Sequence, residues 1–168
     1  MSVKIEEVIT PGQPKAFTVG ASKQSTLADL DPAYKSLLET GVTATLATMN
    51  ANGEPQLTPV WLNHDGEFIN LNSVRGRLKD RNLRARPNVT IMLMNSKNPY
   101  HWMTVWGTVE QIVDEDNPEN GQQATDSIDD LSELYINQRP YPFRKPGDGE
   151  VRVLYKVRPT RIQTFGQP

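Results

Sequence analysis

One stretch decides how this chain folds: Asn70-Leu71-Asn72-Ser73-Val74-Arg75-Gly76-Arg77-Leu78-Lys79-Asp80-Arg81-Asn82-Leu83. Its pattern predicts an extended strand that turns directly into a short, strongly basic helix. Between positions 75 and 86, six cationic residues are opposed by a single carboxylate, Asp80. A helix N-terminus presents unpaired N–H groups and a positive dipole end, so cations placed there are unfavourable unless an anion binds. The stretch therefore predicts a phosphate-binding corner.

This corner offers four side chains with suitable chemistry. Asn72 and Ser73 precede the turn and supply an amide and a hydroxyl group. Arg77 and Lys79 follow it and supply a guanidinium fork and a point charge. A second interpretation stays open, in which the basic helix pairs with the acidic segment 114–133, which has no Lys or Arg. The stretch would then be a structural helix without a ligand.

Outward from the corner, the chain consists of short strands joined mostly by tight turns. Apolar alternation predicts strands at 42–49, 56–63, 67–72, 88–95, 100–113, 151–157 and 161–165, with Pro159 separating the last two. Helices are predicted between Asp31-Pro32 and Gly41, and in the second half of 114–138. Strands this dense indicate a mainly β (α+β) fold, an antiparallel barrel with short flanking helices, and Gly107 marks a bend in its longest strand.

The length of 168 residues fits one domain with a proper core. Residues 1–26 are expected to be a loosely organised N-terminal arm, because they are polar and contain Pro11-Gly12-Gln13-Pro14. The alternative is a short strand formed by the apolar residues between Val3 and Ile9, or an arm laid on a partner. Residues 27–168 are expected to form the domain that carries the corner.

Two other segments are candidates for ligand contact. Thr58, Pro59, Val60 and Trp61 place a proline inside a predicted strand, which favours an edge or a position beside a bound planar group. An ordinary edge strand with a core tryptophan is the alternative. Tyr100 and Trp102 begin an aromatic strand, and such a stripe is more often core than cofactor site. If exposed, it would invite a partner subunit.

The composition excludes several classes of function. A formal net charge of −2 gives no global field to attract nucleic acid, so the local basic cluster favours a small anion. The sequence has no cysteine, and His64 and His101 are far apart, so neither thiolate catalysis nor a metal site is expected. No apolar run approaches the roughly 20 residues of a membrane span, and the N-terminus lacks the apolar core of a secretory signal. A cytoplasmic protein without membrane contact is therefore expected.

Two runs of the sequence resemble a known family. The runs are ATLATMNANGEPQLTPVW, from Ala44, and NSVRGRLKDRNLRARPNVTIMLMNSKNPYHWMTVWGTVE, from Asn72. They are similar to the pyridoxamine 5′-phosphate oxidase-like split β-barrel superfamily, and within it to the flavin/deazaflavin oxidoreductases of the B group, described as probable F420-dependent enzymes. Gly-Arg-x-Lys-x-Arg-Asn-Leu followed by Pro-x-Val is the most specific part. The likeness covers roughly Leu38 to Val113 and, more weakly, VRVLYKVRPTRIQTFG at the end.

The resemblance implies an FMN-binding type of split β-barrel and a homodimer with two cofactor sites between the subunits. In such proteins the segment that matches Asn72 to Lys79 holds the cofactor phosphate, and the segment that matches Thr58 to Trp61 lines the ring. The strand around Tyr100 and Trp102 would reach the site at the dimer interface. The implied reaction is hydride transfer from a reduced cofactor to a small organic acceptor, without a catalytic protein acid.

The resemblance leaves the cofactor open between coenzyme F420 and FMN. F420 is the first choice, because Arg75, Arg81 and Arg84 are additional cations for the carboxylates of its polyglutamyl tail. The alternative function is a non-catalytic flavin- or tetrapyrrole-binding carrier on the same scaffold. A third interpretation is a dimerisation module without an anion site, in which the basic helix pairs with acidic residues elsewhere.

Overall fold

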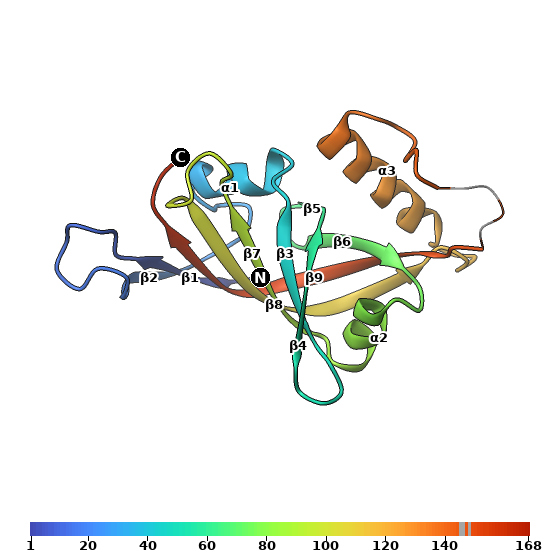
Figure 1. Ribbon diagram of the computed structural model, residues 1–168, viewed down its shortest axis with the longest axis horizontal. Coiled ribbons are helices and arrows are strands. Elements are labelled where there is room, and N and C mark those ends of the chain that lie inside the picture. Colours follow the sequence, from blue (N-terminus) through green and yellow to red (C-terminus); the bar gives the residue numbers. More distant parts are fainter. Residues whose placement is uncertain (145–146, 148) are drawn as a thin grey trace.

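The computed structural model describes residues 1–144, 147 and 149–168, and shows a large sheet with three flanking helices in this part of the chain (Figure 1). The strands are β1 (Val3–Val8), β2 (Val19–Ser25), β3 (Ala44–Met49), β4 (Pro55–Val60), β5 (Leu62–His64), β6 (Ile69–Val74), β7 (Asn88–Met94), β8 (Trp102–Asp114) and β9 (Arg152–Phe165). The helices are α1 (Pro32–Glu39), α2 (Leu78–Ala85) and α3 (Gln122–Ile136).

The fold is mainly β, as predicted, but the sheet is open and mixed. The strand order along the main path is β2-β1-β9-β8-β7-β3-β4, so β2 and β4 are its two edge strands among the described residues. β6 pairs with β9 outside this path, and β5 pairs with β6. β1 lies parallel to β9, whereas the other pairings are antiparallel. The expectation of a purely antiparallel barrel is therefore wrong in these two respects. One buried apolar cluster, which includes Leu46, Ile91 and Val105, forms the core beneath the sheet.

The two longest strands cross the whole molecule side by side. β9 is continuous through Pro159, so the predicted break between 151–157 and 161–165 is wrong. Pro159 lies opposite Gly107, where the register of β8 shifts, and the irregular ladder there tolerates a residue without an N–H group. A Cβ atom on Gly107 would lie 2.7 Å from the Arg158 carbonyl oxygen, which explains the glycine in the predicted bend.

The N-terminal region forms the β1–β2 hairpin, which projects from the sheet in Figure 1. Strand formation by the apolar residues after Val3 was the alternative that the sequence left open. Val3, Ile5 and Val8 are buried, and the buried carboxylate of Glu6 pairs with Lys4 and with Arg161 of β9. These contacts attach the N-terminal strand to the same sheet that carries the rest of the fold.

Helices cover the sheet at two places. α1 begins as predicted, because the Asp31 carboxylate accepts a hydrogen bond from the Ala33 N–H and Pro32 occupies the first turn. Its buried face is Tyr34, Leu37 and Leu38. α3 packs over β6 and β9, with Ala124, Ile128 and Leu131 buried. Among the described residues, no helix combines the length and apolar character needed to cross a membrane.

Candidate functional site

The basic corner forms where β6 ends and α2 begins. β6 pairs with β9 as far as Val74, and Gly76 then turns the chain with a φ of 82°, a left-handed value that favours glycine. Arg77 is the N-cap residue in an extended conformation, and its side chain makes no capping hydrogen bond. The strand-turn-helix predicted for this stretch is confirmed.

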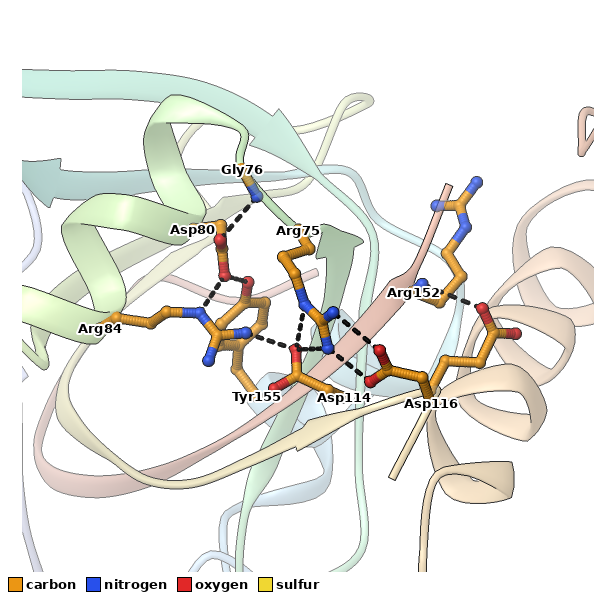
Figure 2. A network of polar contacts seen from close by, with 9 residues as sticks. Arg75, Gly76, Asp80, Arg84, Asp114, Asp116, Arg152 and Tyr155 are labelled. Carbon is orange, nitrogen blue, oxygen red and sulfur yellow. Dashed lines mark hydrogen bonds and ion pairs between the residues drawn. The ribbon is translucent and has the colours of Figure 1, made fainter. Parts of the chain in front are cut away.

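Asp80 takes over the capping role that Arg77 cannot fill (Figure 2). Its carboxylate accepts hydrogen bonds from the Gly76 N–H at 2.7 Å, the Arg84 Nε at 2.7 Å and the Tyr155 hydroxyl at 2.5 Å. Only 2% of Asp80 is exposed. Burial would raise the pKa of this carboxyl, but the three donors together hold it below its usual value. Burial and the neighbouring carboxylate raise the pKa of Tyr155. Asp80 therefore fixes the turn and the first turn of α2 to β9.

Several cations of the corner are neutralised by the chain itself. Arg75 forms a bidentate pair with Asp116 and a further contact with Asp114, and Arg84 also contacts Asp114 (Figure 2). The pairing of the basic segment with the acidic segment is thus realised for these two arginines. Arg81 donates to the Gly76 carbonyl oxygen instead. The three arginines considered for a polyglutamyl tail are engaged by protein groups.

Arg77 and Lys79 are cations that the corner can present to a ligand. The Arg77 side chain is 51% exposed and has one ion pair, with Glu150 at 3.2 Å. Lys79 is partly buried. Among the described residues, none forms an ion pair or a hydrogen bond with its ammonium group. Burial, and then the charge of Arg77, lower the pKa of Lys79 from its ordinary value. A dianionic phosphate would relieve both unfavourable effects, so this pair fits a phosphate group.

Asn72 and Ser73 lie beneath this surface on opposite faces of β6. The Asn72 Nδ2 donates to the Ala124 carbonyl oxygen of α3 at 2.9 Å. Ser73 is buried on the other face, opposite Val153 of β9. Within the described part of the chain, the Asn72 Oδ1 and the Ser73 Oγ have no hydrogen-bond partner. The structure brings these two residues to the corner but not to its exposed side, and their role in phosphate binding stays a prediction.

The segment Thr58 to Trp61 lies at the end of the main sheet path. Pro59 is exposed on β4, opposite Thr45, and β4 pairs with β3 alone among the described strands, so the predicted edge position is confirmed. Trp61 lies between β4 and β5, and its indole stacks on Tyr135 of α3 at a centroid distance of 5.0 Å. Val60 is buried and Thr58 is partly buried. The backbone of this edge is available to a planar ligand.

Tyr100 and Trp102 lie just before and at the start of β8, whereas the corner contacts the end of this strand. Trp102 begins β8 and stacks on Phe165, whereas Asp114, which contacts Arg84, ends the same strand. A strand rises about 3.3 Å per residue, so β8 runs for about 40 Å along its length between these two residues. Tyr100 is 60% exposed. Within one protomer these aromatic residues do not belong to the same site as Arg77 and Lys79.

Two residues that matter at the corner were not predicted as such: Asp80 and Tyr155. The signal for Asp80 was present, since a single carboxylate three residues after the N-cap is a typical capping position. Tyr155 carries no comparable local signal. Among the described residues, there is no group of three His, Asp or Glu side chains able to hold a metal ion.

Comparison with known proteins gives a consistent result. The family model for pyridoxamine 5′-phosphate oxidase matches residues 30–165. A solved structure named F420 reductase has 32% sequence identity and a TM-score of 0.65, and the match covers 79% of this chain and 98% of that one. A conserved hypothetical protein from Mycobacterium tuberculosis has 21% identity and a TM-score of 0.60, covering 78% of this chain and 81% of that one.

A third structure has the same fold at lower identity. It is described as a pyridoxamine 5′-phosphate oxidase homologue from Listeria innocua, with 17% identity and a TM-score of 0.54, and the match covers 77% of this chain and 92% of that one. No curated protein matches the sequence.

Proposed function

The chain belongs to the pyridoxamine 5′-phosphate oxidase family, and from this premise we propose that it is an oxidoreductase that uses coenzyme F420 or FMN. The cofactor phosphate binds Arg77 and Lys79, and the ring lies along the edge from Thr58 to Trp61. When bound, the cofactor supplies hydride transfer to a small organic acceptor. The single observation that carries this proposal is the partly buried Lys79 beside Arg77, with its lowered pKa.

The protein's own residues bind and orient the cofactor. Asp80 holds the turn and α2 in place, so that the N-terminus of α2 and both cations face the phosphate. Pro59 has no N–H group, and its position on an edge strand leaves that side of the sheet open to a planar ring. The proposed hydride transfer requires no proton transfer by a protein side chain.

We further propose a homodimer in which residues from both subunits form the cofactor site. Tyr100 and Trp102 are about 40 Å along β8 from the corner, so they contribute to a cofactor site only from a second copy. Leu57, Met92 and Met94 are exposed on the outward face of β4 and β7. Burial of these side chains against a partner subunit is favourable.

The surplus arginines of the corner do not distinguish the two cofactors. Arg75, Arg81 and Arg84 are engaged by protein groups, so they no longer favour the polyglutamyl tail of F420. F420 remains our first choice because the solved structure at 32% identity is named F420 reductase. FMN is the second choice, since it needs the same phosphate site.

Titration of the purified protein with F420 and, separately, with FMN tests the proposal. The absorbance and fluorescence of each cofactor report binding, and sedimentation reports the oligomeric state. We expect saturable binding of at least one cofactor to a dimer, in the micromolar range or tighter, and oxidation of the reduced cofactor when an acceptor is added. Absence of binding by both cofactors would overturn the proposal. Binding without turnover with any acceptor would support the alternative function, a flavin- or tetrapyrrole-binding carrier.

Cofactor affinity should decrease as the pH rises from neutral towards 10.5, the ordinary pKa of lysine. Burial and Arg77 place the pKa of Lys79 below that value, and a bound phosphate favours the ammonium form and raises it. The affinity is therefore constant below the pKa of the free protein and falls by up to tenfold per pH unit above it. Dissociation constants measured from pH 7 to 10.5 check this.

The matched control is Lys79→Arg, because arginine stays charged throughout this range. Its dissociation constant should change much less with pH than that of the wild type. Equal slopes for the two proteins would show that the cofactor or another protein group titrates instead.

A further inference from the structure

A buried polar network joins α2 to the β3–β4 hairpin, and Asn82 is its centre. Asn82 is 2% exposed and lies on the inner face of α2. Its Nδ2 donates to the Asn50 Oδ1 at 2.9 Å and the Thr48 Oγ1 at 3.1 Å, with a longer contact to the Gln56 Oε1 at 3.4 Å. All three acceptors belong to the two strands of the hairpin or to the turn between them, which lies beside α2 in Figure 1.

Arg86 extends the same network at the end of the helix. Its Nη2 donates to the Asn82 Oδ1 at 3.2 Å, and its Nε donates to the Met49 carbonyl oxygen at 2.7 Å. Both polar ends of the Asn82 amide are therefore satisfied, and the amide is held in one orientation. A buried, fully paired network of this kind specifies a single arrangement of the elements it joins.

α2 is attached to the sheet at several places. Its first turn is held to β9 through Asp80 and Tyr155. Its second half is held to β8 through Arg84, which contacts Asp114, and to the hairpin through Asn82. β4 has no strand on its outer side among the described residues, so neighbouring strands do not restrain that edge. Asn82 therefore links α2 to both strands of the hairpin, to β3 at Thr48 and to β4 at Gln56. Arg86, the C-cap residue, adds a contact to β3 at Met49.

We propose that Asn82 is a positioning residue that sets the spacing between the phosphate-binding and ring-binding halves of the cofactor site. This inference rests on the proposed function, in which Lys79 of α2 binds the phosphate and the segment after Thr58 binds the ring. Gln56 is two residues before Thr58 on the same strand, so a shift of the hairpin at Gln56 moves the ring site directly. A cofactor that carries both groups in one molecule is sensitive to that spacing, whereas its separate parts are not.

Asn82→Ala tests this with three ligands: FMN, riboflavin and inorganic phosphate. Riboflavin carries the ring without the phosphate, and inorganic phosphate carries only the anion. We expect the dissociation constant of FMN to rise tenfold or more, while those of riboflavin and phosphate each change less than twofold. Fluorescence quenching reports the flavins, phosphorus NMR reports phosphate, and F420 replaces FMN if only F420 binds the wild type.

Asn88→Ala is the matched control, since Asn88 is exposed and makes one side-chain contact, with Thr108. It should leave all three dissociation constants unchanged. Gln56→Ala removes one acceptor from a partly exposed strand and should show the same pattern as Asn82→Ala, with a threefold to tenfold effect on FMN. This variant supplies the result if circular dichroism shows that Asn82→Ala is unfolded.

The outcomes distinguish failure of the proposed function from failure of the role of Asn82. If wild-type protein binds neither FMN nor F420, the proposed function fails before Asn82 is examined. If the wild type binds but Asn82→Ala and Gln56→Ala leave the affinity for FMN unchanged, the inference is overturned. A parallel loss of affinity for riboflavin, phosphate and FMN would also overturn it, because that pattern reflects general damage to the site.

Discussion

Asp80→Ala should lower the free energy of unfolding by about 3–5 kcal/mol, the usual range for breaking a buried charged pair by removing one partner. The carboxylate is 2% exposed and accepts from the Gly76 N–H, the Tyr155 hydroxyl and the Arg84 Nε. Alanine would leave the buried hydroxyl of Tyr155 without its acceptor and the turn without its capping group. Urea unfolding followed by circular dichroism measures the change.

Two control variants separate the causes of this loss. Tyr155→Phe keeps the ring and removes only the hydroxyl group, so it should cost about 1–2 kcal/mol. Asp116→Ala removes a carboxylate that also pairs with an arginine, Arg75, but at the exposed rim of the same network. It should change stability little, since exposed ion pairs contribute little. A loss for Asp116→Ala as large as that for Asp80→Ala would contradict the assignment of the buried carboxylate as the structural centre.

The strand-turn-helix of the corner was predictable because its signals are local. Gly76 marks the turn, and the change from apolar alternation to helical spacing lies within a few residues of it. The same is true of α1, where Asp31-Pro32 starts the helix, and of Pro59, whose missing N–H group requires an edge position. Each of these inferences needs only the conformational preferences of neighbouring residues.

The partners of the cations were not predictable, because they are distant in sequence. Arg84 meets Asp114 at a separation of 30 residues, and Asp80 meets Tyr155 at a separation of 75 residues. The acidic segment was recognised as a possible partner, but nothing in its composition distinguishes Asp114 and Asp116 from the acids of α3. The sequence-based preference for F420 counted Arg75, Arg81 and Arg84 as free to bind its polyglutamyl tail. In the structure these arginines contact other groups of the protein.

The continuity of β9 through Pro159 and the pairing of the N-terminal strand β1 also depend on tertiary contacts. Pro159 normally interrupts a ladder, yet the register shift opposite Gly107 absorbs it. β1 pairs with β9 in parallel, with Glu6 contacting Arg161 across a separation of 155 residues. The apolar residues of this strand indicated that it could form, but not which edge it would join.

Replacement of both Arg77 and Lys79 by alanine should weaken cofactor binding by about 2–4 kcal/mol, which is a loss of roughly 30-fold to 1000-fold in affinity. The fold should tolerate this change, because Arg77 is half exposed and neither side chain belongs to the Asp80 network. Fluorescence titration with F420 or FMN measures the loss, and unfolding in urea confirms that stability is retained. The affinity for riboflavin, which has no phosphate, should remain close to that of the wild type.

The control Lys15→Ala with Lys23→Ala removes the same net charge from exposed positions in the N-terminal hairpin, away from the corner. If long-range attraction by net charge were the main source of affinity, this pair and the corner pair would weaken binding equally, and added salt would abolish the difference. Direct hydrogen bonds to phosphate instead predict a large loss for the corner pair alone, with unequal shares for the single variants, because the guanidinium of Arg77 can bind in a bidentate manner. Unchanged titration curves for the corner pair would show that the cations at the corner stabilise the fold and do not bind a ligand. The ion pairs of Arg75 and Arg84 with Asp114 and Asp116 already support such a structural role for those two arginines.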